Sequence, residues 1–393
     1  MRKENLISMV EDRKDELIDL VSRLIRINSE NPTGTQREVV DFVEKYLEKA
    51  GIAYEETGEN PDYPCVVARM GSEDGYSLIF NGHVDVVPAG DRGLWDFEPF
   101  CGTVTDSQIL GRGTSDMKAG VVANMFAARA LKDLGLIDVP MTLMFSPDEE
   151  LGAPTATRVY RERISGARAV ICAEPGFPDG GVTTERRGSG HFHMRISGIS
   201  AHAGRCYEDG ASAILELAHK IVALDAFVDA QAQTIVNTGL ISGGNSANAV
   251  APWADARIHI TFNTVDAAER LVENVRAVAA RTFVPRTTTR ISGGIRLHPL
   301  EYTADVETLF GMAERACAAM GGYTIRRNRA LGASEAGFTA SVLGIPSICS
   351  MGPEGAELHS PSEYLSVDTV LPRCKMIALT AIQAARAFPS TRV

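Results

Sequence analysis

The stretch MTLMFSPDEELG, Met141 to Gly152, joins an apolar run to three consecutive carboxylates, Asp148, Glu149 and Glu150. A short, continuous apolar run of this kind is typical of a strand that is buried on both faces of a sheet. Acidic residues usually lie on solvated surface, so their position directly after a buried strand needs a reason. Other parts of the chain supply one, because further candidate metal ligands follow apolar strands in the same way.

The first part of the chain alternates between helical and extended patterns. Two N-terminal helices are expected, beginning with an amphipathic helix within residues 1–27, and a later helix is expected from Met117 to about Leu134. Short apolar strands are expected at 63–70, 76–87, 141–146 and 167–174. Strands of this kind that alternate with helices predict an α/β domain whose sheet is buried on both faces.

The pattern changes between residues 184 and 298. Its elements are expected in the order β-α-β-β-α-β, with strands and helices at 188–200, 210–224, 233–244, 253–265, 266–280 and 287–294. This order predicts a small α+β (ferredoxin-like) domain with two helices on one side of the sheet. The α/β pattern then returns, with a helix at about 304–321 and a final helix after Val367. We therefore expect a discontinuous domain, 1–183 and 299–393, that is interrupted by an inserted domain, 184–298.

Composition restricts the class of protein. A chain of 393 residues is longer than one hydrophobic core usually supports, which favours two domains. Its net charge of -11 argues against general binding to nucleic acid or to an anionic membrane. No apolar run approaches the roughly 18 residues that span a bilayer. Seven dispersed cysteines without a CxxC pair fit a reducing cytoplasm better than a disulfide framework.

Five stretches place candidate metal ligands at the ends of apolar strands or in the loops that follow. They are FNGHVDVVP, GRGTSDMKAG, FSPDEELG, ICAEPG and ELHSPSEY. Ligands bind at the carboxyl ends of the strands in open α/β sheets. Two histidines and several carboxylates without cysteine suit zinc, cobalt or manganese in a hydrolytic site. Each residue alone has an ordinary alternative, such as a helix N-cap for Asp116, so the prediction rests on the coincidence of all five.

The adjacent glutamates Glu149 and Glu150 suit a site with two metal ions. Such a site needs bridging and terminal ligands and a shared water, and a carboxylate that does not bind metal can take the proton of that water. One glutamate would then be the ligand and the other the base. His83 and Asp85 are two residues apart on a predicted strand, so both point to one face, where Asp85 can orient the imidazole.

These motifs resemble those of the dinuclear zinc exopeptidase and deacylase family, which includes glutamate carboxypeptidase, acetylornithine deacetylase, succinyl-diaminopimelate desuccinylase and aminoacylase. The resemblance covers nearly the whole chain. It implies a zinc-exopeptidase-like, three-layer catalytic domain and an inserted domain that mediates homodimerisation. It also implies two Zn²⁺ ions, with Co²⁺ or Mn²⁺ as substitutes.

The resemblance further implies the ligands of each metal. His83 and Glu174 would hold one ion, Glu150 and His359 would hold the other, and Asp116 would bridge them.

Other roles follow from the same resemblance. Asp85 would support the first metal-binding histidine. Glu149 would be the general base that deprotonates the water and later passes the proton to the leaving amine. The peptide bond from the bridging aspartate to Met117 is expected to be cis.

The inserted segment resembles the family in GISAHAGRCYEDGASAI and GGNSANAVAP. His202 would polarise the scissile carbonyl, in this family often from the partner subunit, and Asn248 would contact the carboxylate end of the substrate. Arg257 and Arg296, with Arg187 as a further candidate, could pair a carboxylate bidentately. The remaining histidines, at 191, 193, 219, 259 and 298, are expected to have no role at the site.

The expected function is that of a cytoplasmic metallohydrolase whose substrate is a small peptide or an N-acyl amino acid, with no nucleic-acid or membrane partner. A glutamate at 174 is common in the carboxypeptidases and deacylases of this family, whereas its aminopeptidases tend to have aspartate. LGASEAGFTA and MGPEGAELH resemble the glutamate carboxypeptidase branch, although those relatives usually have aspartate where Glu335 stands. The main prediction is therefore release of a C-terminal amino acid in the manner of glutamate carboxypeptidase.

Two alternatives stay open. An N-acyl-amino-acid deacylase of the acetylornithine or desuccinylase type would use the same metal site, so the motifs do not separate it from a carboxypeptidase. A non-catalytic binding protein with the same fold is the second alternative. Glu149 argues against it, because a binding protein has no need of a base.

Overall fold

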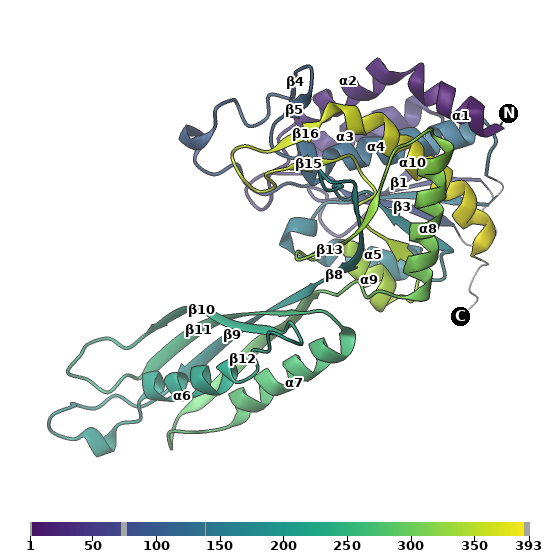
Figure 1. Cartoon of the computed structure of the whole chain (residues 1–393). Coiled ribbons are helices and arrows are strands. Elements are labelled where there is room, and N and C mark those ends of the chain that lie inside the picture. Colours follow the sequence, from purple (N-terminus) through teal and green to yellow (C-terminus); the bar gives the residue numbers. More distant parts are fainter. Residues whose placement is uncertain (1, 72–76, 138, 389–393) are drawn as a thin grey trace. The chain divides into compact units, whose positions relative to one another are not determined.

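The computed structural model describes residues 2–71, 77–137 and 139–388 and has a mixed α/β fold, as predicted (Figure 1). The chain forms two compact units. The first consists of Met1–Glu185, Tyr302–Ala330 and Phe338–Val393, and the second of Arg186–Glu301 and Leu331–Gly337. The division into a catalytic and a dimerisation domain stays a prediction at this point.

The described helices are α1 (Arg2–Glu11), α2 (Lys14–Ile25), α3 (Arg37–Lys49), α4 (Ala119–Asp133), α5 (Pro154–Arg163), α6 (Ala213–Asp225), α7 (Val265–Ala280), α8 (Ala304–Ala319), α9 (Glu335–Ser341) and α10 (Val367–Ala387). Short helical turns are η1 (Arg92–Leu94), η2 (Thr114–Lys118), η3 (Glu149–Leu151) and η4 (Tyr207–Asp209).

The described strands of the first unit are β1 (Ala53–Thr57), β2 (Cys65–Met70), β3 (Leu78–His83), β4 (Thr103–Val104), β5 (Gln108–Leu110), β6 (Met141–Ser146), β7 (Ala169–Cys172), β8 (Gly181–Arg186), β13 (Arg326–Ala330), β14 (Ser347–Ile348), β15 (Gly355–Ala356) and β16 (Tyr364–Ser366). Those of the second unit are β9 (Gly188–Ser197), β10 (Ile235–Gly243), β11 (Trp253–Phe262) and β12 (Thr288–Leu297).

The first unit is built on a sheet with the strand order β1-β2-β6-β3-β7-β14. Its centre is parallel, because β3 runs parallel to β6 and β7, and β14 runs parallel to β7. Strands β1 and β2 add to one edge in antiparallel pairs. Every residue of β3, β6 and β7 is buried, which agrees with their continuous apolar sequences. The predicted strand over 76–87 is β3; Tyr76 at its start lies outside the described residues.

Two details of this unit differ from the sequence-based expectation. The helix expected within 1–27 is two helices, α1 and α2, which meet at Asp12 and Arg13. Helix α3, which takes the place of the second expected N-terminal helix, and strand β1 then precede β2. Strand β1 has the charged sequence AYEET and no buried residue. It was missed because an edge strand with a single antiparallel neighbour carries no apolar pattern.

The second unit is a four-stranded antiparallel sheet with the order β10-β11-β9-β12. Alternate residues of β9 and β11, including Phe192, Met194, Ile258 and Ile260, join residues of α6 and α7 in one hydrophobic core. Both helices therefore cover the same face of this sheet (Figure 1). The predicted β-α-β-β-α-β order with two helices on one side is confirmed.

Two further observations bear on the class of protein. Within the described ranges, no helix has both the length and the apolar composition to cross a bilayer. The seven cysteines are free thiols, and five of them are buried.

Candidate metal centre

Parallel pairing brings the ends of three strands to one edge of the central sheet. In the register of β3 with β6, His83 lies opposite Ser146, and in that of β3 with β7, Asn81 lies opposite Cys172. The residues that follow β6 and β7 therefore lie beside His83. Glu149 and Glu150 begin η3, three residues beyond β6, and Glu174 stands two residues beyond β7. This is the carboxyl edge at which open α/β sheets bind ligands.

Asp116 reaches the same edge from the turn before α4. The predicted helix from Met117 begins two residues later, at Ala119, because Asp116 and Met117 have non-helical backbone angles. The peptide bond between them is cis, as expected. A Cβ added at Gly120 would lie 1.9 Å from the carbonyl oxygen of Ala173. Only glycine allows the start of α4 to pack this closely on the residue before Glu174.

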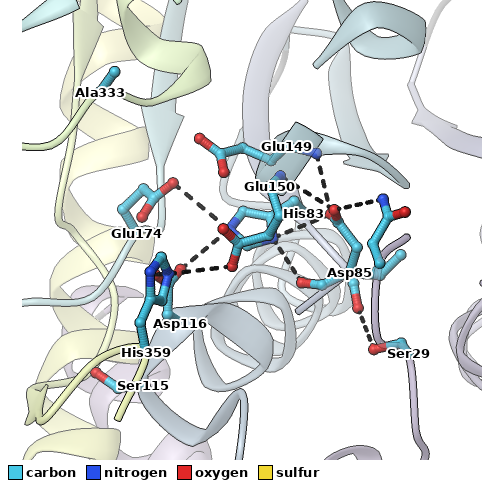
Figure 2. Close-up of polar contacts among 12 residues, drawn as sticks. Ser29, His83, Asp85, Ser115, Asp116, Glu149, Glu150, Glu174, Ala333 and His359 are labelled. Carbon is cyan, nitrogen blue, oxygen red and sulfur yellow. Dashed lines mark hydrogen bonds and ion pairs between the residues drawn. The ribbon is translucent and has the colours of Figure 1, made fainter. Parts of the chain in front are cut away.

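His359 completes the cluster from the loop between β15 and β16. Its backbone φ is 62°, in the left-handed region, and 52% of its side chain is exposed. Figure 2 shows its imidazole beside the carboxylates of Asp116 and Glu150.

The five predicted ligands form two groups that share Asp116. Nε2 of His83 lies 3.1 Å from Oδ1 of Asp116 and 3.8 Å from Oε1 of Glu174. Nε2 of His359 lies 3.3 Å from Oδ2 of Asp116 and 3.4 Å from Oε1 of Glu150. Within each group the candidate ligand atoms all lie within 4.8 Å of one another. The two oxygens of Asp116 thus face one imidazole each.

The charges of this cluster fit divalent cations. Four carboxylates, those of Asp116, Glu149, Glu150 and Glu174, face two imidazoles, which leaves an excess of negative charge in a largely buried site. Oε1 of Glu150 is buried with no hydrogen-bonding partner among the described residues, although Nε2 of His359 is 3.4 Å away. Imidazole nitrogens and carboxylate oxygens without thiolate are the donors that zinc, cobalt and manganese accept. The donor set therefore fits the predicted metals.

The two histidines respond to this negative charge. Burial alone would lower the pKa of His83, but its hydrogen bonds with Asp116 and Asp85 raise that pKa well above its usual range. Asp116 and then Glu150 raise the pKa of His359 to about 10. In both cases the surrounding carboxylates stabilise a positive charge on the imidazole, and a metal cation would take the same place.

Glu149 lies next to the two groups and belongs to neither. Its side chain is 8% exposed. Burial raises the pKa of Glu149 well above its usual range, and the charges of Glu174, Glu150 and Asp116 raise it further, against the opposing effect of His83. Such a carboxylate holds a proton more tightly than an exposed glutamate does, which is the property that a general base requires.

Asp85 supports the cluster mainly through the backbone of the neighbouring turn. Its carboxylate accepts hydrogen bonds from the amides of Glu149 (3.1 Å) and Glu150 (3.2 Å), and from Nδ2 of Asn31 (3.0 Å). Nδ1 of His83 lies 2.9 Å from the carbonyl oxygen of Asp85 and 3.4 Å from its Oδ1. Asp85 therefore contacts the imidazole as expected and also fixes the two glutamates, a role that the sequence did not suggest.

Asp148, the first residue of the acidic triplet, has a structural role. Its Oδ2 accepts a hydrogen bond of 2.8 Å from the amide of Thr155 in the first turn of α5. A carboxylate in this place satisfies a backbone donor that has no partner within the helix.

A buried ion pair that sequence reasoning missed holds the Asp116 turn. Oε1 of Glu363 accepts hydrogen bonds from the amides of Ser115 (3.0 Å) and Asp116 (3.1 Å), and Glu363 is also paired with Arg112. Arg112 is 2% exposed and Glu363 is fully buried. The sequence suggested Glu363 only as a candidate metal ligand in ELHSPSEY, and it offers no signal that pairs residues 251 positions apart.

Four further predicted site residues, His202, Asn248, Arg257 and Arg296, lie in the second unit at two separate places. His202 and Asn248 are close in space, because the amide of Ala203 donates to the carbonyl of Asn248 (3.0 Å) and His202 pairs with Ala249 in a β-bridge. Nδ1 of His202 accepts a hydrogen bond from the amide of Gly204 (3.2 Å). A neutral imidazole held in this way carries its proton on Nε2, which is then a donor.

Arg257 and Arg296 instead line one pocket over the sheet. They come from different strands, β11 and β12, and face the same hollow. His202 and Asn248 are not among the residues that line this pocket.

Comparison with known proteins agrees with this geometry. A family model described as peptidase family M20/M25/M40 matches residues 79–383. A succinyl-diaminopimelate desuccinylase from Paracoccus denitrificans (strain Pd 1222) is 33% identical over 278 residues, which cover 66% of this chain and 71% of the relative. One from Gluconacetobacter diazotrophicus is 29% identical over 345 residues, which cover 84% and 85%.

Solved structures share the fold. The aminopeptidase PepT from Bacillus cereus superposes with a TM-score of 0.75 at 20% identity, covering 95% of this chain and 99% of that one. The YXEP protein of Bacillus subtilis, described as a dinuclear metal binding peptidase from the M20 family, has a TM-score of 0.71 at 17% identity, covering 96% and 99%. Since the family model spans most of the chain, this protein belongs to peptidase family M20/M25/M40 and is a metal-dependent hydrolase.

Proposed function

We propose that this protein is an N-acyl-amino-acid deacylase that hydrolyses the amide bond of an N-succinylated or similarly acylated amino acid. The observation that carries the hydrolytic part is the shared position of Asp116 between two groups of ligands, with the buried Glu149 beside them. The deacylase part is supported by the names of the relatives, which are succinyl-diaminopimelate desuccinylases. The main prediction from the sequence, a glutamate-releasing carboxypeptidase, has less support than this alternative.

The metal ions are proposed to be two Zn²⁺, for which Co²⁺ or Mn²⁺ could substitute. His83 and Glu174 would hold one ion, Glu150 and His359 the other, and Asp116 would be a ligand of both. Such ions supply positive charge that polarises the amide carbonyl and lowers the pKa of the attacking water.

The residues of this chain would then act in a definite order. Glu149 takes a proton from the attacking water and passes it to the nitrogen of the leaving amine, so that one carboxylate serves as base and then as acid. Asp85 holds the backbone of Glu149 and Glu150 by accepting a hydrogen bond from the amide of each. His202 would donate from Nε2 to the carbonyl oxygen that gains negative charge. Asn248 would contact the carboxylate end of the substrate, and Arg257 and Arg296 stay candidates for binding a carboxylate.

The second unit is also proposed to form a homodimer. Strand β10 is an edge strand that pairs only with β11, and its Ile241 is 64% exposed. Helix α6 exposes Val222 (74%), Ile214 (46%) and Leu215 (42%). Exposed apolar residues on an edge strand and on the adjacent helix are suited to self-association about a two-fold axis.

The seven free thiols fit a reducing compartment.

The substrate class is tested with a panel of N-succinyl amino acids, N-acetyl amino acids, N-acyl glutamates and dipeptides, using metal-loaded protein. We expect N-succinyl amino acids to have the highest kcat/KM, by at least about tenfold, which corresponds to roughly 1.4 kcal/mol of transition-state stabilisation. Faster cleavage of N-acyl glutamates or dipeptides would contradict the deacylase proposal and support the carboxypeptidase predicted from the sequence. Turnover of no amide in the panel would contradict the proposal as a whole.

The roles of Glu149 and His202 are tested by Glu149→Gln and His202→Ala. We expect Glu149→Gln to lower kcat by about 10²–10⁴-fold, because the base is lost, while elemental analysis still finds two metal ions per chain. His202→Ala should lower kcat with unchanged metal content. Near-wild-type turnover of Glu149→Gln would rule out its role as base, and loss of metal from His202→Ala would show that this histidine had been misplaced.

The Arg112–Glu363 pair is proposed to position Asp116 for metal binding. Arg112→Met leaves the buried Glu363 carboxylate without its cation, so we expect the free energy of unfolding to fall by about 3–5 kcal/mol. We also expect fewer metal ions per chain after dialysis. Arg92→Met is the matched control, because Arg92 and Glu98 form an exposed pair that contributes at most about 1 kcal/mol. If Arg112→Met keeps wild-type metal content and stability, the pair has no such role.

Self-association is tested with the double variant Val222→Lys/Ile241→Lys. Two charges on the exposed surface of the second unit should convert a dimer into a monomer, as measured by light scattering coupled to size-exclusion chromatography. Leu94→Lys, which changes an exposed leucine of the first unit, should leave the mass unchanged. A monomeric wild type, or a double variant that stays dimeric, would contradict the proposed interface.

A further inference from the structure

The segment MGPEGAELH, residues 351–359, ends at a candidate metal ligand and contains a glutamate that turns away from solvent. Glu354 is 6% exposed and pairs with Arg373 of α10, whose side chain is fully buried. Removing two opposite charges from water costs free energy that their attraction often only balances. The pair is therefore weak evidence for added stability, and its further contacts indicate what it does.

Arg373 holds three parts of the first unit together through one guanidinium. Its Nη1 donates to the carbonyl oxygen of Ser350 (3.0 Å). Its Nη2 donates to the carbonyl oxygen of Gly181 (3.2 Å) and to Oε1 of Glu354 (2.9 Å). Its Nε donates to the hydroxyl of Tyr323 (3.0 Å). The planar fork of arginine offers donors in several fixed directions, which the single ammonium of lysine does not.

Tyr323 and α10 complete the fixation of Glu354. Burial raises the pKa of the Tyr323 hydroxyl, against the opposing charge of Arg373. The hydroxyl therefore keeps its proton and donates a hydrogen bond to Oε1 of Glu354. The amide of Glu354 donates to Oγ1 of Thr369, in the first turn of α10 (2.9 Å). Both the side chain and the backbone of Glu354 are thus held.

The segment that ends at this glutamate, residues 350–354, pairs with the backbone around Glu174. The amide of Gly352 donates to the carbonyl oxygen of Glu174 (3.0 Å), and the amide of Gly176 donates to that of Pro353 (3.0 Å). These bonds continue the parallel pairing of β7 with β14 beyond the ends of both strands. The backbone of this candidate metal ligand is therefore bonded to a segment whose two ends are bound by one guanidinium.

Close packing leaves this backbone little freedom to move. A Cβ added at Gly176 would lie 2.7 Å from Cζ of Arg373, and one added at Gly352 would lie 2.2 Å from the carbonyl oxygen of Ala173. The guanidinium therefore lies directly against the chain two residues after Glu174. Because cores are packed this tightly, a displaced guanidinium would shift the neighbouring backbone.

We propose that Arg373 is a positioning residue for Glu174, and through it for the metal ion that His83 and Glu174 would hold. Glu354 and Tyr323 fix the direction of the guanidinium, and the guanidinium fixes the backbone that carries the ligand. Arg373 belongs to neither group of candidate ligands, so it acts through the backbone. This role rests on the proposed ligands of the metal ions and not on the proposed substrate.

The two metal sites are compared by titrating zinc-loaded, full-length protein with a chelator and following the imidazole NMR signals of His83 and His359. Arg373→Met/Glu354→Gln removes both charges of the buried pair, so that neither is left unpaired. We expect its zinc at His83 to be held about tenfold more weakly than in the wild type, because groups that orient a ligand affect metal affinity to this extent. The change at His359 should be smaller. Tyr323→Phe, which removes one hydroxyl, should weaken zinc binding at His83 by a smaller factor.

Lys375→Met is the matched control. Lys375 lies two residues further along α10, and its Nζ is 2.8 Å from Oε1 of Glu11. The variant removes a cation from the same helix, and it should leave the release of zinc at both histidines unchanged.

A purely structural role of the cluster would give a different result. The variants would then unfold at a lower temperature, while the folded protein would release zinc as the wild type does. That result, or equal weakening at His83 and His359, would overturn the positioning role. If the double variant does not fold, Tyr323→Phe decides the question, because it keeps the ion pair.

The proposed ligands are tested in the same titration. If the His83 signals of the wild type do not respond to the removal of zinc, the assignment of His83 as a ligand is wrong, and the role of Arg373 is overturned with it. None of these measurements requires turnover, so they stand or fall separately from the proposed deacylase activity.

Discussion

The candidate metal centre depends on the parallel register of β3 between β6 and β7. Backbone hydrogen bonds fix His83 opposite Ser146 and Asn81 opposite Cys172. The residues just beyond these strand ends, which include Glu149, Glu150 and Glu174, therefore lie at the edge of the sheet where β3 ends at His83. A shift of one residue in any of these strands would turn its side chains to the other face and disperse the cluster.

Crowding four carboxylates in a largely buried place is unfavourable unless other groups offset their charge. Backbone amides and an arginine, none of which is a candidate metal ligand, offset part of this negative charge. Asp85 accepts the amides of both glutamates of η3, and Glu363, paired with Arg112, accepts the amides of Ser115 and Asp116. These contacts fix the backbone around the ligands, so the ligand oxygens are held in place for divalent cations.

The two units use polar residues in different ways. In the first, carboxylates gather at the ends of buried strands and form an acidic centre. In the second, histidines and arginines occupy the face of the sheet opposite its two helices, where the glycines of the outer strands leave a basic hollow. The first arrangement suits cations.

The sequence by itself determined the class of fold and the residue types of the metal centre. Buried parallel strands and the β-α-β-β-α-β segment leave periodic patterns that can be read locally. Histidines and carboxylates after apolar strands or glycine-rich turns are informative because five such stretches occur in one chain. It did not reveal the charged edge strand β1, which has no buried residue. Nor did it reveal that Asp148 accepts a hydrogen bond from the amide of Thr155 in the first turn of α5. Only the tertiary structure decided that Glu363 meets Arg112, and that His191, His259, Arg257 and Arg296 share one pocket. These groupings depend on strand register and on loop closure between residues far apart in the chain, and no local pattern encodes such distances.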